Sequence, residues 1–232
     1  MRSPGDPVSE ARQFLGKIPL FADLSEASCL ALAQAGKFVQ VEKEQFIFLQ
    51  SDPSEKAYLV RSGLISIILE SLDGRKLVIN EMRSGDFFGE VGVLTKQPRS
   101  SSAIARIDSV LLVLPRQAFL GILESEPALV RRLLEMIAIR LRESSERESA
   151  LAFLDAQGRL VRLLLQLGQQ ELEKGYITIS QEELAARTGQ TRQTVAKALG
   201  RWRRAGWLIT GRGRIMLLKH AALSNLEQEW SN

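Results

Sequence analysis

The stretch ISQEELAARTGQTRQTVAKALGRW, residues 179–202, predicts two short helices that meet at a glycine. Ser180 followed by Glu183 forms a capping-box pattern, which marks a helix start. Gly189 then provides a turn before Thr191 caps a second helix. Helices joined in this way form either an ordinary helical hairpin or a helix-turn-helix.

The second helix is predicted to be amphipathic. Val195, Leu199 and Trp202 recur at i, i+4 and i+7 and form a stripe that should be buried. The sequence WLITGRGRIMLL, residues 207–218, reads as a following hairpin with two arginines at its turn, Gly211 to Arg214. The hairpin favours a winged helix-turn-helix, which inserts the N-terminal end of its second helix into the major groove of DNA. The outer face of that helix carries side chains suited to bases and phosphates: Arg192, Gln193, Ala196 and Lys197.

The charge distribution points to the same partner. The chain has 232 residues, of which 45% are hydrophobic and 25% are charged, as expected of a folded protein, and its formal net charge is +4. Residues 156–219 contain twelve Lys or Arg against four Asp or Glu, so this segment carries +8 and the remainder −4. A solvated basic face would account for this excess, but a polyanion such as double-stranded DNA accounts for it together with the motif.

A long helix is predicted before the basic segment, beginning at Pro127. Seven residues of this helix are spaced alternately four and three positions apart, which is the a/d pattern of a coiled coil. This pattern predicts a homodimer. An ordinary amphipathic helix packed on its own domain is the alternative. After a break near Asp155, Gly158 is expected to open another helix. The seam residues are Val130, Leu134, Ile137, Leu141, Ser144, Glu148 and Leu151.

Short apolar runs from about Phe38 to Leu114 are predicted to be strands. Turn signals separate them at regular intervals of eleven residues: SG at 62–63, DG at 73–74 and SG at 84–85. This spacing fits strands joined by hairpins in a small antiparallel barrel or sandwich.

The stretch FFGEVGVLTKQPRSSSA, residues 87–103, predicts a ligand site. Gly85 and Gly89 bring backbone amides close to a small anion, and Arg99 offers a planar fork for a phosphate. Glu90 can only accept hydrogen bonds, and a ribose hydroxyl is a natural donor to it. The spacing alone equally allows a surface ion pair between Glu90 and Arg99.

This stretch resembles the phosphate-binding cassette of cyclic-nucleotide-binding domains. From about Leu20 to Leu218, the chain resembles the cyclic AMP receptor protein and fumarate–nitrate reductase regulator family of bacterial transcription factors. Two other stretches that carry this resemblance are YLVRSGLISI and RLRESSERESALAFLDAQGRL. The resemblance implies an α+β fold with an N-terminal cyclic-nucleotide-binding β-roll that is jelly-roll-like. The implied domains are the sensor (1–125), the dimerisation helix (126–154) and the winged helix-turn-helix (155–232).

The resemblance also implies roles for single residues in binding the nucleotide. Glu90 would accept from the ribose 2′-hydroxyl, Arg99 and Ser100 would bind the cyclic phosphate, and Gly89 would permit close approach. Ser144 and Ser145 would contact the purine, one of them from the partner subunit. Arg140, one turn earlier, would hold Glu90 in place.

Cyclic AMP is the expected effector, with cyclic GMP as the alternative because serine hydroxyls can serve either purine. Cys29 is the only cysteine and His220 the only histidine, so no metal, haem or iron–sulfur cluster is expected. For the same reason we expect no enzyme such as a metal-dependent phosphodiesterase. A ligand-independent DNA-binding dimer with a vestigial pocket is a further alternative.

The expected DNA contacts come from helix starts, the outer face and the wing. Hydroxyls at helix starts should meet phosphates, Arg192 and Lys197 should reach guanine, and Gln193 can bond adenine. The segment LGQQELEKGYITIS is shorter than the family's loop that touches RNA polymerase, so that contact stays open. Without a signal peptide or membrane span, we expect a cytoplasmic protein. The expected DNA-binding residues are Ser180, Thr191, Arg192, Gln193, Thr194, Lys197 and Arg212.

Overall fold

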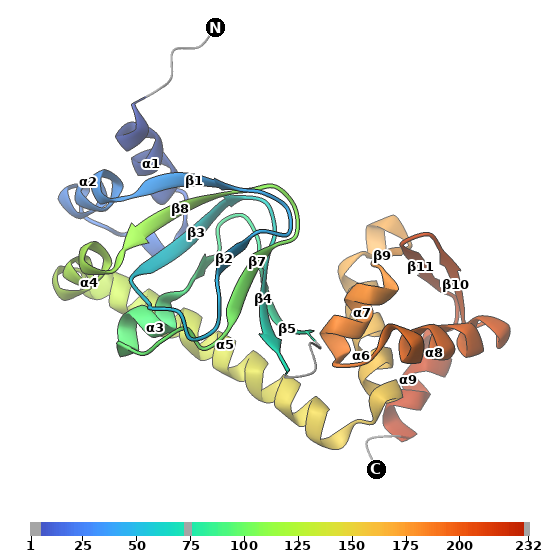
Figure 1. Cartoon of the computed structure of the whole chain (residues 1–232). Coiled ribbons are helices and arrows are strands. Elements are labelled where there is room, and N and C mark those ends of the chain that lie inside the picture. Colours follow the sequence, from blue (N-terminus) through green and yellow to red (C-terminus); the bar gives the residue numbers. More distant parts are fainter. Residues whose placement is uncertain (1–5, 72–75, 230–232) are drawn as a thin grey trace, which may run out of the picture. The chain divides into compact units, whose positions relative to one another are not determined.

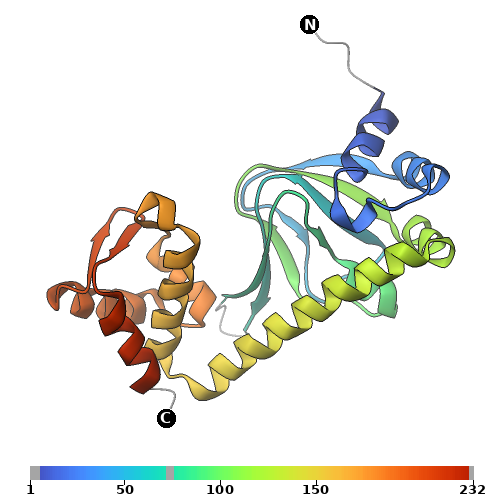
Figure 2. The ribbon, with the colours of Figure 1, turned by 180° about the vertical axis from the view of Figure 1, so that it is seen from behind.

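The computed structural model describes residues 6–71 and 76–229 and divides the chain into two compact units (Figures 1 and 2). The sensor unit comprises Met1–Glu70 and Val78–Arg140, and the C-terminal unit comprises Ser71–Leu77 and Leu141–Asn232. The predicted α+β architecture is confirmed, with β-rich and helical parts in separate stretches of the chain.

The sensor unit begins with helices that the sequence interpretation did not predict. They are α1 (Pro7–Leu15), the 3₁₀ helix η1 (Pro19–Phe21) and α2 (Glu26–Ala35). Two further helices belong to this unit: α3 (Glu90–Thr95) lies between two strands, and α4 (Arg116–Ser125) follows the last strand. The strands are β1 (Lys37–Val41), β2 (Phe46–Phe48), β3 (Lys56–Ser62), β4 (Ile65–Glu70), β5 (Lys76–Met82), β6 (Phe87–Phe88), β7 (Ser102–Ala105) and β8 (Ser109–Pro115).

These strands form two four-stranded sheets, in the orders β1-β8-β3-β6 and β2-β7-β4-β5. Gly63 and Gly85 lie at turns, as predicted, and have φ values of 112° and 95°. The hairpin prediction is wrong at both, because β3 and β6 belong to one sheet while β4 and β5 belong to the other. Each of these turns therefore carries the chain between sheets, as in a jelly roll. The third turn signal, at residues 73–74, lies outside the described residues.

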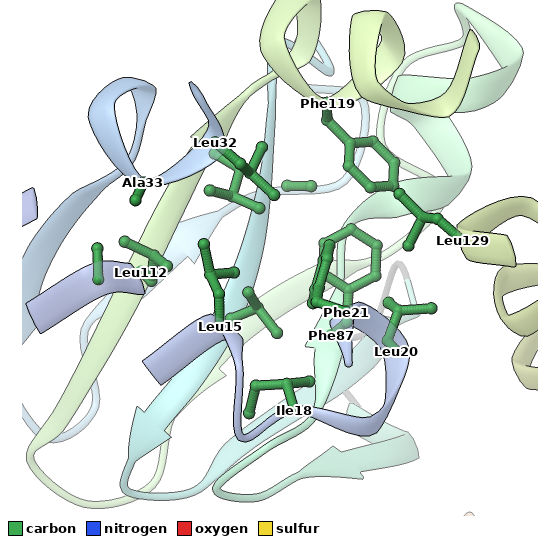
Figure 3. Packing of buried hydrophobic residues seen from close by; sticks show 14 of the residues in the cluster. Leu15, Ile18, Leu20, Phe21, Leu32, Ala33, Phe87, Leu112, Phe119 and Leu129 are labelled. Carbon is green, nitrogen blue, oxygen red and sulfur yellow. The ribbon is translucent and has the colours of Figure 1, made fainter. Parts of the chain in front are cut away.

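Strand β3 is buried on both of its faces because each face packs against a different layer. Tyr58 and Val60 contribute to a core with residues from strands of both sheets. Ala57 and Leu59 point the other way, into a core shared with the helices. In Figure 3, Phe87 of β6 lies among Phe21 and Phe119 in this second core, with ring centroids 5.8 Å and 5.0 Å from its own. The N-terminal helices thus complete the sensor core.

Helix α5, Pro127–Phe153, is continuous and crosses the boundary between the units. One face of its first half packs on the sensor core through Leu129 and Leu133, which are 2% and 4% exposed. Leu134 and Leu141 belong to the predicted seam and are 62% and 66% exposed. Ile137, another seam residue, is partly buried against the sensor core. The helix therefore packs one apolar face on its own domain, and only part of the predicted seam is open. The side chain of the last seam residue, Leu151, lies outside the part of the chain that the structure describes.

The C-terminal unit begins its own packed core with α6, Ala156–Gln170. The prediction that Gly158 opens this helix is wrong by two residues. Asp155 is the N-cap, and its Oδ1 accepts hydrogen bonds from the backbone N–H groups of Gln157 and Gly158. After α6 come η2 (Leu172–Lys174), β9 (Ile177–Thr178), α7 (Gln181–Thr188), α8 (Arg192–Arg204), β10 (Leu208–Gly211), β11 (Arg214–Leu217) and α9 (His220–Glu229).

The helix-turn-helix and its wing are confirmed. Val195, Leu199 and Trp202 are at most 2% exposed. Strands β10 and β11 pair antiparallel and place residues 212 and 213 at the turn, while β9 adds a third strand. Among the described residues, no helix is both long and apolar enough to cross a membrane.

Candidate functional site

The ligand-site stretch is shaped by Gly89, which joins β6 to α3. Its φ of 77° is left-handed, a conformation that glycine adopts without steric cost. A Cβ at this position would lie 2.9 Å from Nη1 of Arg99 and 3.1 Å from Cδ2 of Tyr58. Both the backbone conformation and the room for the Arg99 guanidinium therefore require glycine here.

Glu90 is the first residue of α3 and is only 3% exposed. Its Oε1 accepts a hydrogen bond of 2.7 Å from Nη1 of Arg140 on α5. The other guanidinium nitrogen of Arg140 donates to the backbone oxygen of Phe87. Arg140 thus fixes the carboxylate relative to the end of β6. The alternative ion pair between Glu90 and Arg99 is wrong, because the ion pair of Glu90 is with Arg140.

Arg99 is buried, with 5% of its surface exposed, and its terminal nitrogens donate to backbone carbonyls. Nη1 lies 2.7 Å from the oxygen of Gly89, and Nη2 lies 2.5 Å from the oxygen of Lys56. Nε is buried and has no hydrogen-bond partner among the described residues. Burial lowers the pKa of Arg99 from its usual value, while Tyr58 acts in the opposite direction.

Two aromatic rings support the Arg99 side chain. Cζ of Arg99 lies 4.1 Å from the ring centroid of Phe48 and 5.6 Å from that of Tyr58, both within cation–π range. Burial raises the pKa of Tyr58 from its usual value. The sequence interpretation missed both rings, because they lie on β2 and β3, far from the 87–103 stretch, and apolar strands gave no signal of contact with a charge.

This arrangement fits an anion with a neighbouring hydroxyl. A buried guanidinium that donates to two neutral backbone carbonyls and keeps its Nε–H unpaired gains from a phosphate that accepts from it. The carboxylate of Glu90 can accept from a hydroxyl group. The structure brings together Gly89, Glu90, Arg99 and Arg140 through these contacts.

The serines predicted for the site lie in different settings. Ser100 is exposed and follows Arg99 directly. Ser144 and Ser145 lie on α5, the first of them one turn beyond Arg140. The Ser144 hydroxyl donates to Glu148 Oε1 over 3.3 Å, and the Ser145 hydroxyl donates to the backbone oxygen of Leu141 over 3.1 Å. Both hydroxyls also keep lone pairs for further donors.

In the C-terminal unit, side-chain hydroxyls cap both helices of the helix-turn-helix. The hydroxyl of Ser180 accepts from the backbone N–H of Glu183 over 3.1 Å, and that of Thr191 accepts from Thr194 over 3.2 Å. In a complete capping box, the Glu183 carboxylate would accept from the backbone N–H of Ser180. Here this carboxylate pairs with Arg187 instead. Ser180, Thr191 and Thr194 are exposed at these helix starts.

A hollow of about 430 Å³ lies between the start of α7, the start of α8 and the wing. Its lining includes Ser180, Arg192 and Arg212, so three of the predicted DNA-binding residues are brought together. Gln193 and Lys197 are exposed elsewhere on α8. Their spacing of four residues places them on the face opposite the buried stripe.

The described residues contain no group of three or more His, Cys, Asp or Glu that could hold a metal ion. Cys29 is partly buried, and burial raises the pKa of its thiol.

Comparisons with known proteins agree with both parts of this description. Residues 38–126 match the model of the cyclic nucleotide-binding domain, and residues 158–226 match that of the Crp-like helix-turn-helix domain. The chain is 29% identical over 202 residues to the CRP-like cAMP-activated global transcriptional regulator of Mycobacterium tuberculosis, covering 84% of this chain and 90% of that protein. It is 32% identical over 180 residues to the cyclic AMP receptor protein of Thermus thermophilus, covering 78% and 83%.

Among solved structures, a CRP/FNR-family transcriptional regulator from Thermus thermophilus has a TM-score of 0.67 at 28% identity, covering 84% of this chain and all of that one. The sensor fold and the winged helix-turn-helix together define a cyclic-nucleotide-binding transcription regulator that binds DNA. The chain belongs to the cyclic AMP receptor protein family, which also includes the fumarate–nitrate reductase regulators.

Proposed function

We propose that the protein is a homodimeric transcription regulator whose effector is cyclic AMP. The observation that carries this proposal is the buried guanidinium of Arg99, whose Nε has no hydrogen-bond partner among the described residues and whose terminal nitrogens bond neutral carbonyls. The cyclic phosphate supplies the missing anion. The names of the relatives from Mycobacterium tuberculosis and Thermus thermophilus support cyclic AMP as the nucleotide.

In the proposed complex, the phosphate, the ribose and the purine each have protein partners. Arg99 and Ser100 bind the phosphate, and Gly89 leaves room for it. Glu90, oriented by Arg140, accepts from the ribose 2′-hydroxyl, since Arg140 already occupies Oε1 and the second carboxylate oxygen remains for another donor. Ser144 and Ser145 contact the purine, one of them from the partner subunit.

The proposed dimer uses the exposed seam leucines of α5. Leu134 and Leu141 share one face of the helix, which a second copy of the helix would cover. Because Ser144 and Ser145 lie on the same helix as these leucines, nucleotide contacts through them would act directly on the dimer helix. This gives the ligand a route to the DNA-binding units.

The proposed dimer binds a pseudo-palindromic DNA site, in the cytoplasm. Each α8 enters a major groove, with half-sites about 34 to 36 Å apart. Arg192, Gln193 and Lys197 face the bases, and phosphates meet the capping hydroxyls of Ser180, Thr191 and Thr194 and the guanidinium of Arg212. RNA polymerase is a further proposed partner once the dimer is bound at a promoter.

Calorimetry of the purified protein with cyclic AMP and with cyclic GMP tests this proposal. We expect tighter binding of cyclic AMP, with one nucleotide per subunit. Tighter binding of cyclic GMP would change the effector, and heat of binding from neither nucleotide would leave a ligand-independent DNA-binding protein.

A further inference from the structure

Gly200 lies inside α8, where glycine weakens a helix relative to alanine. Its backbone does not have the positive φ that would demand glycine. A Cβ at this position would meet nothing within 4 Å, so packing within the described chain leaves room for a side chain. A helical glycine that its own chain does not require is typical of a place where another backbone approaches closely.

Arginines surround this glycine in the last turn of the helix. Arg201, Arg203 and Arg204 are exposed, and none of the carboxylates described in the structure forms an ion pair with them. Cations at a helix C-terminus interact favourably with the helix dipole, which accounts for basic residues in this turn. The dipole acts along the axis, however, and does not favour one side of the helix over another.

The arginines differ in the side of the helix that they occupy. Successive residues are about 100° apart around an α-helix, so positions separated by four or seven residues share a face. Arg203 and Arg204 follow Gly200 by three and four residues, the spacings at which positions are neighbours on a helix surface. Arg201 is the next residue after Gly200 and points about 100° away from it around the helix.

We propose that the last turn of α8 is a phosphate-binding surface, where the DNA backbone crosses the helix at Gly200 between Arg203 and Arg204. Seven residues separate Gln193 from Gly200, which corresponds to about 10 Å along the helix. The major groove is about 12 Å wide, so a helix with Gln193 at the base edges meets the sugar-phosphate wall of the groove near Gly200. This inference rests on the proposed entry of α8 into the major groove.

The first test measures how DNA affinity depends on salt. The probe is the duplex that the wild-type protein selects from random DNA, and the protein is the full chain with cyclic AMP present. We expect Arg203→Gln and Arg204→Gln each to reduce the slope of log K against log salt by about 0.9, the value for one phosphate contact. Arg201→Gln removes the same charge from the same turn and should leave the slope almost unchanged. Equal decreases in all three variants, or no decrease in any, would overturn the proposal.

The second test uses Gly200, whose replacement should have opposite effects on the fold and on binding. Gly200→Ala should raise the melting temperature of the protein, because alanine favours the helix, and should lower its affinity for the duplex. Gly200→Gln should lower the affinity further, without changing the bases selected. Full affinity in both variants contradicts a backbone crossing at this position. A wild-type protein that selects no DNA site at all would instead contradict the proposed function, and the inference with it.

Discussion

The two arginines Arg99 and Arg204 are both proposed to bind phosphate, yet they lie in opposite environments. Arg99 is 5% exposed, is bonded to two backbone carbonyls and packs against the Phe48 ring. Arg204 is exposed at the end of a helix. A buried, oriented donor makes a site that selects one small ligand and is little affected by salt. Exposed arginines along a helix face instead bind a long polyanion through many contacts of similar strength, each of which is sensitive to salt.

The comparison predicts its largest effect at the buried arginine. Arg99→Leu should weaken cyclic nucleotide binding at least roughly tenfold, because a charge-assisted hydrogen bond contributes about 1.5 to 3 kcal/mol. Calorimetry measures this loss directly. Arg99→Lys is the matched control, since it keeps the charge but loses the planar fork, and its affinity should lie between those of the other two proteins. Undiminished binding by the leucine variant, shown to be folded by circular dichroism, would contradict the phosphate assignment.

The second prediction concerns the link between the two regions. Ser144→Ala combined with Ser145→Ala should abolish most of the effect of cyclic AMP on DNA affinity, which for allosteric proteins is typically about 1 to 3 kcal/mol. The physical reason is that these hydroxyls connect the proposed purine position to α5. The measurement is DNA affinity with and without nucleotide. Ser149→Ala, on the same helix but outside the predicted site, is the control. An unchanged nucleotide effect in the double variant would mean that the signal takes another route.

The third prediction tests base recognition by the exposed helix. Gln193→Glu should change the preferred base pair at one position of each half-site, because glutamate accepts from cytosine N4 while glutamine can bond adenine through N6 and N7. Discrimination at this position should be about 1 to 3 kcal/mol. Sites selected from random DNA by the two proteins at the same salt concentration provide the measurement. If both proteins select the same motif, Gln193 does not read a base.

Local patterns predicted the C-terminal unit well because its elements depend on neighbouring residues. The buried stripe at Val195, Leu199 and Trp202 and the caps at Ser180 and Thr191 follow from helix spacing and side-chain chemistry alone. The start of α6 was missed by two residues because Gly158 was taken as the helix start, although Asp155 is the stronger N-cap signal. The phosphate surface on the last turn of α8 was not anticipated either.

The sensor was predicted less completely because its organisation depends on long-range pairing. The turns at Gly63 and Gly85 follow from local chemistry, but whether a turn joins neighbours or crosses between sheets depends on long-range strand pairing. Strand β3 pairs with β8 and β6 in one sheet, and β4 lies between β7 and β5 in the other. The same is true of the site. Its charged residues were found by resemblance, whereas Phe48 and Tyr58, which support Arg99, come from strands about forty to fifty residues earlier.

The smallest predicted effect is on stability, at the junction between α5 and α6. Asp155→Ala removes the acceptor of two backbone hydrogen bonds, of 2.9 Å and 2.7 Å, and should lower the free energy of unfolding of the C-terminal unit by about 1 kcal/mol. Asp155→Asn keeps an acceptor at the N-cap and should be nearly neutral. All three tryptophans lie at or beyond residue 202, so their fluorescence during urea unfolding reports on this unit. Equal stability of the alanine and asparagine variants would show that the cap contributes little. The start of α6 would then depend on the burial of Leu160 and Val161, both fully buried in the core of this unit.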